Sequence, residues 1–366
     1  MHSGKHITRQ LLIIFCLAGF HLSSACAPQA VEGQPAIQTV PEGYLEPATQ
    51  SARNTIRFAA MGDIMMGSEG SLPADGGAGF FRDVKPYLAG RDVVFGNLEG
   101  PLTDRGKPAK SIAPGRSYVF RTPPSYGAHL KDAGFSVLSL ANNHANDYGP
   151  EGRAQTIAVL DNLGIKHTGA HGQITIQNVK DMRVAFIGLA PNAGCQNIND
   201  IPGAVDLVKK ALRVSNTLVV VSFHGGAEGA DNMRLPNGPE QYLGEKRGDL
   251  RRLARAVIDA GAALVIGHGP HVPRGLEVYK GRLIAYSLGN FATAAGINVR
   301  GATGLAPLLL ADLLPSGELV DMKLISFRQQ YNQGPKSDAG NEAARTILSL
   351  SEGMLDPQWA KRLRNP

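Results

Sequence analysis

Residues 135–147 read FSVLSLANNHAND, and this stretch decides how the rest of the chain is interpreted. The apolar run from Val137 to Leu140 leads directly into two amides, an imidazole and a carboxylate. A short apolar run without polar alternation is typical of a strand that is buried on both faces. In layered α/β proteins, functional groups lie just beyond the carboxyl ends of such strands. We therefore expect residues 142–147 to bind a ligand or to take part in catalysis.

The same unit recurs along the chain from Thr55 onward, as an apolar run, a polar cluster and a helical segment. The other runs are IRFAAMGD (56–63), VVFGNLEG (93–100), RVAFIGLAPN (183–192), LVVVSFHGG (218–226), ALVIGHGPH (263–271) and RLIAYSLGN (282–290). Helical segments are predicted at 123–134, 150–164 and 245–262. Alternating strands and helices indicate a layered α/β domain.

The N-terminus has the features of a secretory signal over residues 1–26. Lys5 and Arg9 precede a short apolar segment and a stretch of small residues. The apolar segment is about half the length of a membrane span. Leu22–Cys26 resembles a bacterial lipobox with Ser23 where Leu is usual, so we expect Cys26 to be the lipidated first residue of a membrane-anchored lipoprotein of the cell envelope. Ordinary cleavage after Ala27 is the alternative and would give a secreted or periplasmic protein.

Composition adds three constraints. Residues 27–54 are rich in Pro, Ala, Gln and Glu, which indicates a flexible linker. The net charge is +6, and two basic residues of the signal account for +2, which leaves about +4 afterwards. Basic residues are scattered without a nucleic-acid-binding motif, so no nucleic acid is expected as a partner. Of the 3 cysteines, only Cys195 lies beyond the signal region, so the mature chain can form no intramolecular disulfide.

The predicted strand ends together supply many groups that bind metals. They are Asp63, Asn97, Glu99, Asn143, His144, Asp147, His224, His268 and His271. Carboxylates, amide oxygens and imidazoles can bind Zn²⁺, Mn²⁺ or Fe, and a further imidazole can act as general acid. Each residue also has a structural alternative, such as a turn held by Asn142 and Asn143. The coincidence of ligand-type residues at five strand ends favours a common site.

Six motifs give a more specific resemblance: MGDIMMG, GNLEGPLTD, LANNHANDYG, SFHGG, IGHGPHV and GRLIAYSLGNF. Their order over about residues 56–291 resembles the CapA family of bacterial capsule synthesis proteins, which is associated with poly-γ-glutamate. That family is similar to the calcineurin-like metallophosphatases. The resemblance implies a four-layer α/β/β/α sandwich, with two mixed sheets between layers of helices.

The resemblance also implies roles for individual residues. From the residues themselves we expect His144 to be the general acid, and Asp147 to orient it and to raise the pKa of its imidazole toward the working pH. The implied metal ligands are Asp63, Glu99, Asn143, His224, His268 and His271. Three departures from the phosphatase pattern are Met65 in place of a ligand, Glu99 in place of a bridging Asp, and two residues instead of one between the last histidines. We therefore expect one divalent metal, Mn, Zn or Fe, instead of two.

The expected function is the synthesis or processing of a capsule polymer such as poly-γ-glutamate, by metal-dependent hydrolysis of an amide-linked polyanion. A non-catalytic module that binds the polymer during assembly or export is the alternative. A third hypothesis is a metal-free acid–base pair of His144 and Glu99. Expected partners are the polymer, the membrane through Cys26, and capsule-synthesis membrane proteins. The expected domain runs over 55–331, and a loop and helices at 332–366 close it.

Overall fold

The structure is a computed structural model that describes residues 55–110, 118–294 and 296–364. The predicted signal, Cys26 and the predicted linker lie outside the described residues. Within the described part, no helix is both long enough and apolar enough to cross a membrane.

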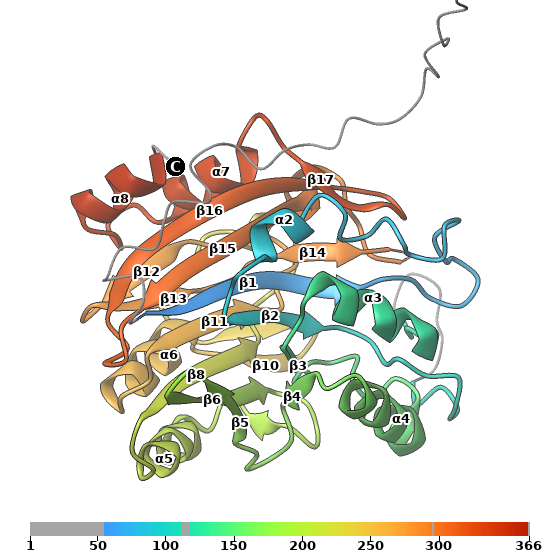
Figure 1. Cartoon of the computed structure of the whole chain (residues 1–366), viewed down its shortest axis with the longest axis horizontal. Helices are drawn as coiled ribbons and strands as arrows, with labels where there is room; N and C mark the ends of the chain where they lie inside the picture. Colours follow the sequence, from blue (N-terminus) through green and yellow to red (C-terminus); the bar gives the residue numbers. More distant parts are fainter. Residues whose placement is uncertain (1–54, 111–117, 295, 365–366) are drawn as a thin grey trace, which may run out of the picture. The chain divides into compact units, whose positions relative to one another are not determined.

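The first sheet has eight strands, in the order β17-β16-β15-β1-β2-β3-β4, and β14 also pairs with β1 (Figure 1). Strands β1 to β4 and β14 are parallel to one another, whereas β15 is antiparallel to β1 and to β16, and β17 is antiparallel to β16. The strands are β1 (Ile56–Met65), β2 (Val93–Leu98), β3 (Val137–Ser139), β4 (Lys166–Thr168), β14 (Asn290–Thr293), β15 (Leu305–Leu313), β16 (Leu319–Gln330) and β17 (Gly334–Ser337).

The second sheet has seven strands, in the order β12-β13-β11-β8-β6-β5, and β7 pairs with β6. Its central strands are parallel, and β12 and β5 are antiparallel to their neighbours. The strands are β5 (Thr175–Val179), β6 (Met182–Ala190), β7 (Gln196–Asn197), β8 (Thr217–His224), β11 (Leu264–His268), β12 (Leu276–Tyr279) and β13 (Arg282–Ala285). A separate hairpin consists of β9 (Glu240–Tyr242) and β10 (Glu245–Gly248).

Helices form at the three predicted places, with one correction. The helices are α2 (Lys85–Leu88), α3 (Gly127–Ala133), α4 (Gly149–Asn162), α5 (Ile201–Leu212), α6 (Leu250–Asp259), α7 (Glu342–Leu350) and α8 (Pro357–Arg364), and short 3-10 turns are η1 (Pro124–Tyr126), η2 (Ala230–Asn232) and η3 (Gly301–Gly304). The helix predicted at 245–262 begins only at Leu250, because Gly248 has a positive φ of 94° and Asp249 caps the helix by accepting from the Arg252 N–H. The preceding residues form β10 instead.

Three buried apolar clusters separate the layers. In β1, Phe58 and Ala60 belong to the cluster between the two sheets, whereas Ala59 and Met61 belong to the cluster beneath α2, α3 and α4. This alternation is what the two faces of a strand require. A third cluster lies between the second sheet and helices α5 and α6. Three apolar interfaces make four layers, helix, sheet, sheet and helix, which confirms the predicted fold class.

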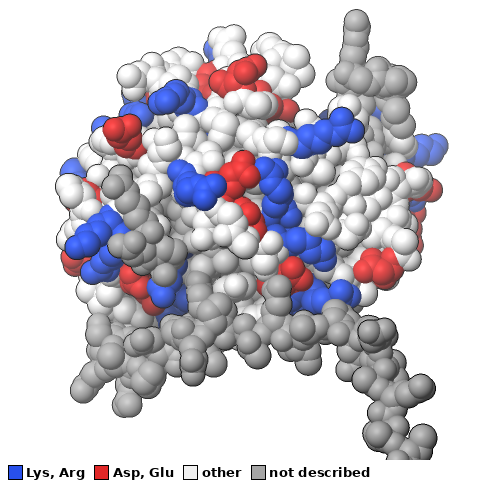
Figure 2. All heavy atoms as spheres, turned by 90° about the horizontal axis from the view of Figure 1, so that it is seen from above, with Lys and Arg blue, Asp and Glu red and all other residues white. Residues whose placement is uncertain are grey.

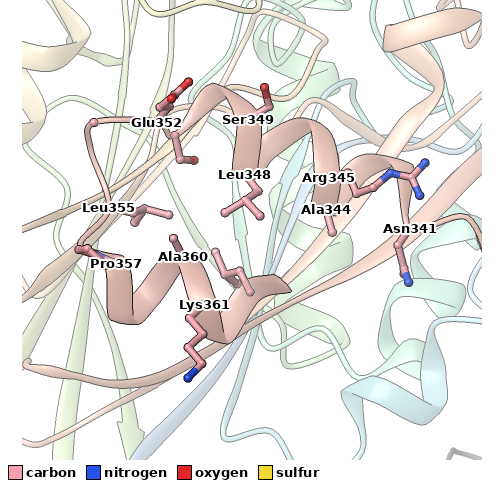
Figure 3. A pocket seen from close by; sticks show the side chains of 13 residues that line it. Asn341, Ala344, Arg345, Leu348, Ser349, Glu352, Leu355, Pro357, Ala360 and Lys361 are labelled. Carbon is pink, nitrogen blue, oxygen red and sulfur yellow. The ribbon is translucent and has the colours of Figure 1, made fainter. Parts of the chain in front are cut away.

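The C-terminal helices α7 and α8 pack on β15 and β16 (Figure 1). Ile347 of α7 and Trp359 and Leu363 of α8 join the cluster between the sheets. Figure 2 views the molecule from above relative to Figure 1. On this face, basic and acidic side chains are interspersed over the described surface and do not form one large basic area. A hollow of about 980 Å³ lies between α7 and α8, and Leu348 and Leu355 point into it (Figure 3). None of its lining residues belongs to the strand ends predicted to carry function.

Candidate metal centre

Strand pairing brings the predicted residues together at one edge of the sandwich. Asp63 at the end of β1 lies in register with Asn97 of β2 and with Asn290 of β14. In the second sheet, His224 at the end of β8 lies in register with His268 at the end of β11. The carboxyl ends of parallel strands share an edge, so both sheets contribute side chains to the same place.

A compact ligand group forms at this edge from Asp63, Glu99 and His271. Each can offer one ligand atom such that all three atoms lie within 4.8 Å of one another. Asp63 Oδ1 lies 3.3 Å from His268 Nδ1, and Asp63 Oδ2 lies 3.3 Å from His271 Nδ1. Glu99 Oε1 lies 3.8 Å from His224 Nε2. His224 and His268 therefore border the group.

Several buried polar atoms at this edge have no hydrogen-bond partner among the described residues. They are both carboxylate oxygens of Glu99, His224 Nε2, His268 Nε2 and Asn143 Oδ1. A buried polar atom without a partner costs about 1–3 kcal/mol, and a charged one costs more. These atoms are the oxygen and imidazole donors that a divalent transition metal prefers. The residues present therefore fit the metal that the sequence predicts.

The pKa directions describe a site that attracts a cation. Burial raises the pKa of Glu99 well above its usual range, and the negative charges of Asp63 and Glu228 add to this shift. Burial would also raise the pKa of Asp63, but hydrogen bonds and positive charge from His268 and His271 outweigh it and lower that pKa well below its usual range. Burial would lower the pKa of His271, yet the surrounding carboxylates raise it to about 10. A protonated His271 offsets the negative charge of these carboxylates.

Two amides connect this group to the turn after β3. Asn97 Nδ2 donates to Asp63 Oδ1 at 2.9 Å, and Asn97 Oδ1 accepts from Asn142 Nδ2 at 3.0 Å. Asn142 also accepts from the His144 N–H at 3.0 Å, so it holds the turn as the structural alternative expected. Both the nitrogen and the oxygen of the Asn97 amide are hydrogen-bonded. At the end of β2, the oxygens without a partner among the described residues are therefore those of Glu99.

His144 and Asp147 form the predicted pair. His144 Nδ1 lies 2.7 Å from Asp147 Oδ2, so Asp147 holds the Nδ1 proton and leaves Nε2 for other chemistry. Asp147 also accepts from the Phe120 N–H at 2.8 Å and pairs with Lys110 Nζ at 2.7 Å. The predicted rise in the pKa of His144 is wrong. Burial lowers that pKa and outweighs the effect of Asp147.

A cavity of about 290 Å³ opens in front of these residues. Its polar wall includes His144, His271, Asn290 and Glu228. Aromatic side chains complete its rim, among them Tyr118, Phe120 and Tyr242. The cavity is smaller than the hollow at α7 and α8, but it reaches the strand ends.

Three residues at the site were not predicted. Asn290 Oδ1 lies 2.9 Å from His271 Nδ1, Glu228 Oε2 lies 3.8 Å from His271 Nε2, and Lys110 pairs with Asp147. Asn290 ends the run at 282–290, so the strand-end rule could have found it. Glu228 and Lys110 lie in loops and carry no such signal. Met65 is buried and has no carboxylate or imidazole to offer, as the sequence indicated.

Comparison with known proteins agrees with the resemblance seen in the motifs. The profile of the family described as bacterial capsule synthesis protein PGA_cap matches residues 57–295. The chain is 32% identical over 271 residues to the capsule biosynthesis protein CapA of Bacillus anthracis, and 32% identical over 255 residues to the PGA biosynthesis protein CapA of Bacillus subtilis (strain 168). These matches cover 68% and 64% of this chain, and 62% and 63% of the relatives' lengths.

Solved structures resemble the chain more distantly. A crystal structure described as a novel phosphatase of Mycoplasma pneumoniae is 13% identical, with a TM-score of 0.46. The match covers 82% of this chain and 99% of that one.

Proposed function

The chain belongs to the family of bacterial capsule synthesis proteins that includes CapA, and from this premise we propose that it hydrolyses an amide-linked polyanion such as poly-γ-glutamate during capsule synthesis or processing. One observation carries the hydrolytic part. Buried ligand atoms without partners, on Glu99, His224 and His268, lie at the same edge of the sandwich as the oriented His144–Asp147 pair. Metal ligands and an acid–base group in one place are the parts that metal-assisted hydrolysis needs.

In this proposal some residues bind the metal and others transfer protons. Asp63, Glu99 and His271 hold one divalent ion, and His224, His268 and Asn143 supply the remaining donors. When bound, such an ion polarises the scissile carbonyl and lowers the pKa of water. His144 is neutral at pH 7 because its pKa is lowered, so Nε2 accepts a proton from the attacking water and then returns it to the leaving nitrogen. Asp147 stabilises the imidazolium that forms between these two transfers.

A polymer-shortening assay tests this proposal. Purified protein loaded with Mn²⁺ or Zn²⁺ is incubated with poly-γ-glutamate, and chain length is followed by gel electrophoresis. Metal-dependent shortening that a chelator abolishes is the expected result. Binding of the polymer without shortening would instead support a module for assembly or export. The buried Met65 at the end of β1, which offers no carboxylate or imidazole where the motif resemblance implies a ligand, is the observation that favours this second function.

We also propose that the protein is exported and anchored through a lipidated Cys26. Support comes from the basic start, the short apolar run and the lipobox-like Leu22–Cys26. Mass spectrometry of the N-terminal peptide from bacterial membranes should give a diacylglyceryl-modified Cys26, and Cys26→Ser should release the protein from the membrane fraction. An unmodified N-terminus at Pro28 would contradict the anchor and indicate ordinary secretion.

A further inference from the structure

Glu228 is a carboxylate at the cavity wall that has no role in the function proposed above. It lies in the loop between β8 and β9, and two backbone hydrogen bonds fix its neighbours. The Ala227 N–H donates to Glu240 Oε2 at 2.9 Å, and the Gly229 N–H donates to the Pro270 carbonyl at 3.0 Å. The second bond attaches this loop to the segment that carries His271. Glu228 is thus held in a defined position relative to that imidazole.

The orientation of the Glu228 side chain is also determined. The buried Arg247 donates from Nη2 to Glu228 Oε1 at 3.0 Å. Arg247 is held in turn by an ion pair with Glu245 and lies over the ring of Tyr242. With Oε1 engaged, Oε2 is directed to the other side, where it lies 3.8 Å from His271 Nε2.

The hydrogen bonds of His271 identify which of its nitrogens can bind a metal. Asn290 Nδ2 donates to the Thr303 carbonyl at 3.1 Å, which turns Asn290 Oδ1 toward His271. His271 Nδ1 donates to that oxygen at 2.9 Å and therefore carries the proton of the neutral ring. Nε2 is then the atom with a free lone pair. It faces Glu99 Oε1 at 3.7 Å and Glu228 Oε2 at 3.8 Å.

We propose that Glu228 is a further ligand of the divalent ion, and that its Oε2 binds together with His271 Nε2 and Glu99 Oε1 on the side of the site that faces the cavity. The two carboxylate oxygens approach the imidazole from the Nε2 side, where the lone pair is. Ligands about 2.1 Å from one ion lie roughly 3.0–3.5 Å apart, and both carboxylate oxygens are within a few tenths of an ångström of that separation from His271 Nε2. Glu228 lies outside the compact group of Asp63, Glu99 and His271, so its side chain must move toward Glu99 when the ion binds. The fully buried Glu99 oxygens have no hydrogen-bond partner among the described residues, as expected of atoms that bind a cation. Glu228 would supply the charge that the chain lacks at Met65. The assignment rests on the metal-binding part of the proposed function.

Calorimetric titration of the purified full chain with Mn²⁺ tests the assignment. Glu228→Gln removes the charge and keeps the side-chain length, and its amide oxygen can still accept from Arg247. We expect at least about a tenfold loss of Mn²⁺ affinity. Glu228→Asp keeps the charge but shortens the side chain by one methylene. If Glu228 is a ligand, this variant should lose a similar amount of Mn²⁺ affinity; if its role is purely electrostatic, the affinity should be nearly unchanged.

Glu245→Gln is the matched control, because Glu245 also pairs with Arg247 but has no contact with His271 among the described residues. It should bind Mn²⁺ as the wild type does. Melting temperatures of the metal-free variants should stay close to that of the wild type, which separates loss of a ligand from loss of fold. Wild-type affinity in Glu228→Gln, or in Glu228→Asp, would overturn the assignment alone. Failure of the wild type to bind any Mn²⁺ would overturn the metal dependence of the proposed function together with it.

Discussion

His271 occupies a backbone conformation that few residues adopt. Its φ of 59° lies in the left-handed region, which is uncommon for residues other than glycine, although histidine tolerates it better than most. Nearby, Gly269 has a φ of 115°, and a side chain there would meet the Gly225 carbonyl oxygen at 2.5 Å. The turn at 268–271 therefore stores strain of about 1–3 kcal/mol. This strain is consistent with a segment shaped to direct the imidazole into the site.

Asn290 is expected to matter for metal binding without touching the metal. Its Oδ1 holds the Nδ1 proton of His271, and such partners typically contribute 10–100-fold to affinity. Asn290→Ala should therefore weaken Mn²⁺ binding by roughly that factor, measured by calorimetry. Asn290→Asp, which keeps the acceptor, should restore most of the affinity. Equal affinities in all three proteins would show that the hydrogen bond has no such role.

His144→Ala tests the acid–base role. The variant should keep its fold and its metal but lose roughly 10²–10⁴-fold in turnover of the polymer. His129→Ala is a suitable control, because His129 is half-buried away from the strand ends, where it contacts the Gly76 carbonyl and the ring of Tyr126. A sharply lower melting temperature with intact activity per folded molecule would instead make His144 a structural residue.

At the scale of elements, β1 and the segment that precedes β14 are in close backbone contact. A Cβ on Gly62 would lie 1.9 Å from the Gly289 carbonyl oxygen, which itself accepts from the Asp63 N–H at 2.8 Å. Gly62→Ala must therefore push the two backbones apart and displace Asp63. We expect a loss of roughly 2–4 kcal/mol in the free energy of unfolding by urea denaturation, together with weaker metal binding.

The comparison for this substitution is Gly340→Ala. A Cβ there would first meet a side-chain oxygen of Asp338, which can move aside. Its effect on unfolding should stay within about 0.5 kcal/mol, as for most surface substitutions. If Gly62→Ala were as mild as this control, the close contact would not be what positions Asp63.

The strands could be predicted from the sequence because most are buried on both faces. The apolar runs correspond to β1, β2, β3, β6, β8, β11 and β13, and no polar alternation obscures them. The apolar run at the start of 282–290 forms β13, as predicted, but the polar cluster that follows it leads into a strand of the other sheet. Strand β13 ends at Ala285 in the second sheet, and Asn290 begins β14 in the first, after Gly289 turns the chain with a φ of 62°. Periodicity reveals burial but does not say which sheet a strand joins.

The candidate site could be predicted only where it coincides with strand ends. Glu228 escaped prediction because a loop places it, and long-range contacts fix that loop. Arg274 is fully buried and binds both oxygens of Glu240, which in turn accepts from the Ala227 N–H. Partners tens of residues apart in the sequence determine this position. The composition and residue spacing near Glu228 therefore do not indicate that it belongs to the site.

At the scale of the whole molecule, the site joins the two sheets. Asp63 and Glu99 follow strands of the first sheet, whereas His224 and His268 end strands of the second. A metal that binds only the folded chain stabilises it by RT ln(1 + [L]/Kd), about 2.7 kcal/mol at a hundredfold excess over Kd. Mn²⁺ should therefore raise the melting temperature by several degrees, and a chelator should reverse the change.

His268→Ala provides the check on that prediction. It removes a donor of the second sheet, so the melting temperature should respond much less to Mn²⁺, while the metal-free protein still folds. If Mn²⁺ raised the melting temperature of His268→Ala as much as that of the wild type, the ion would bind elsewhere or would not join the two sheets.

The packing of α8 has a spectroscopic consequence. Trp359 is the one tryptophan of the chain, and it is 7% exposed within the cluster between the sheets. It does not line the cavity at the strand ends. Its emission should be blue-shifted in the native state and should move to the red when the C-terminal helices detach. Fluorescence at 295 nm excitation would therefore follow the opening of this end of the sandwich and stay silent when a ligand enters the cavity, so the two events can be observed independently in one sample.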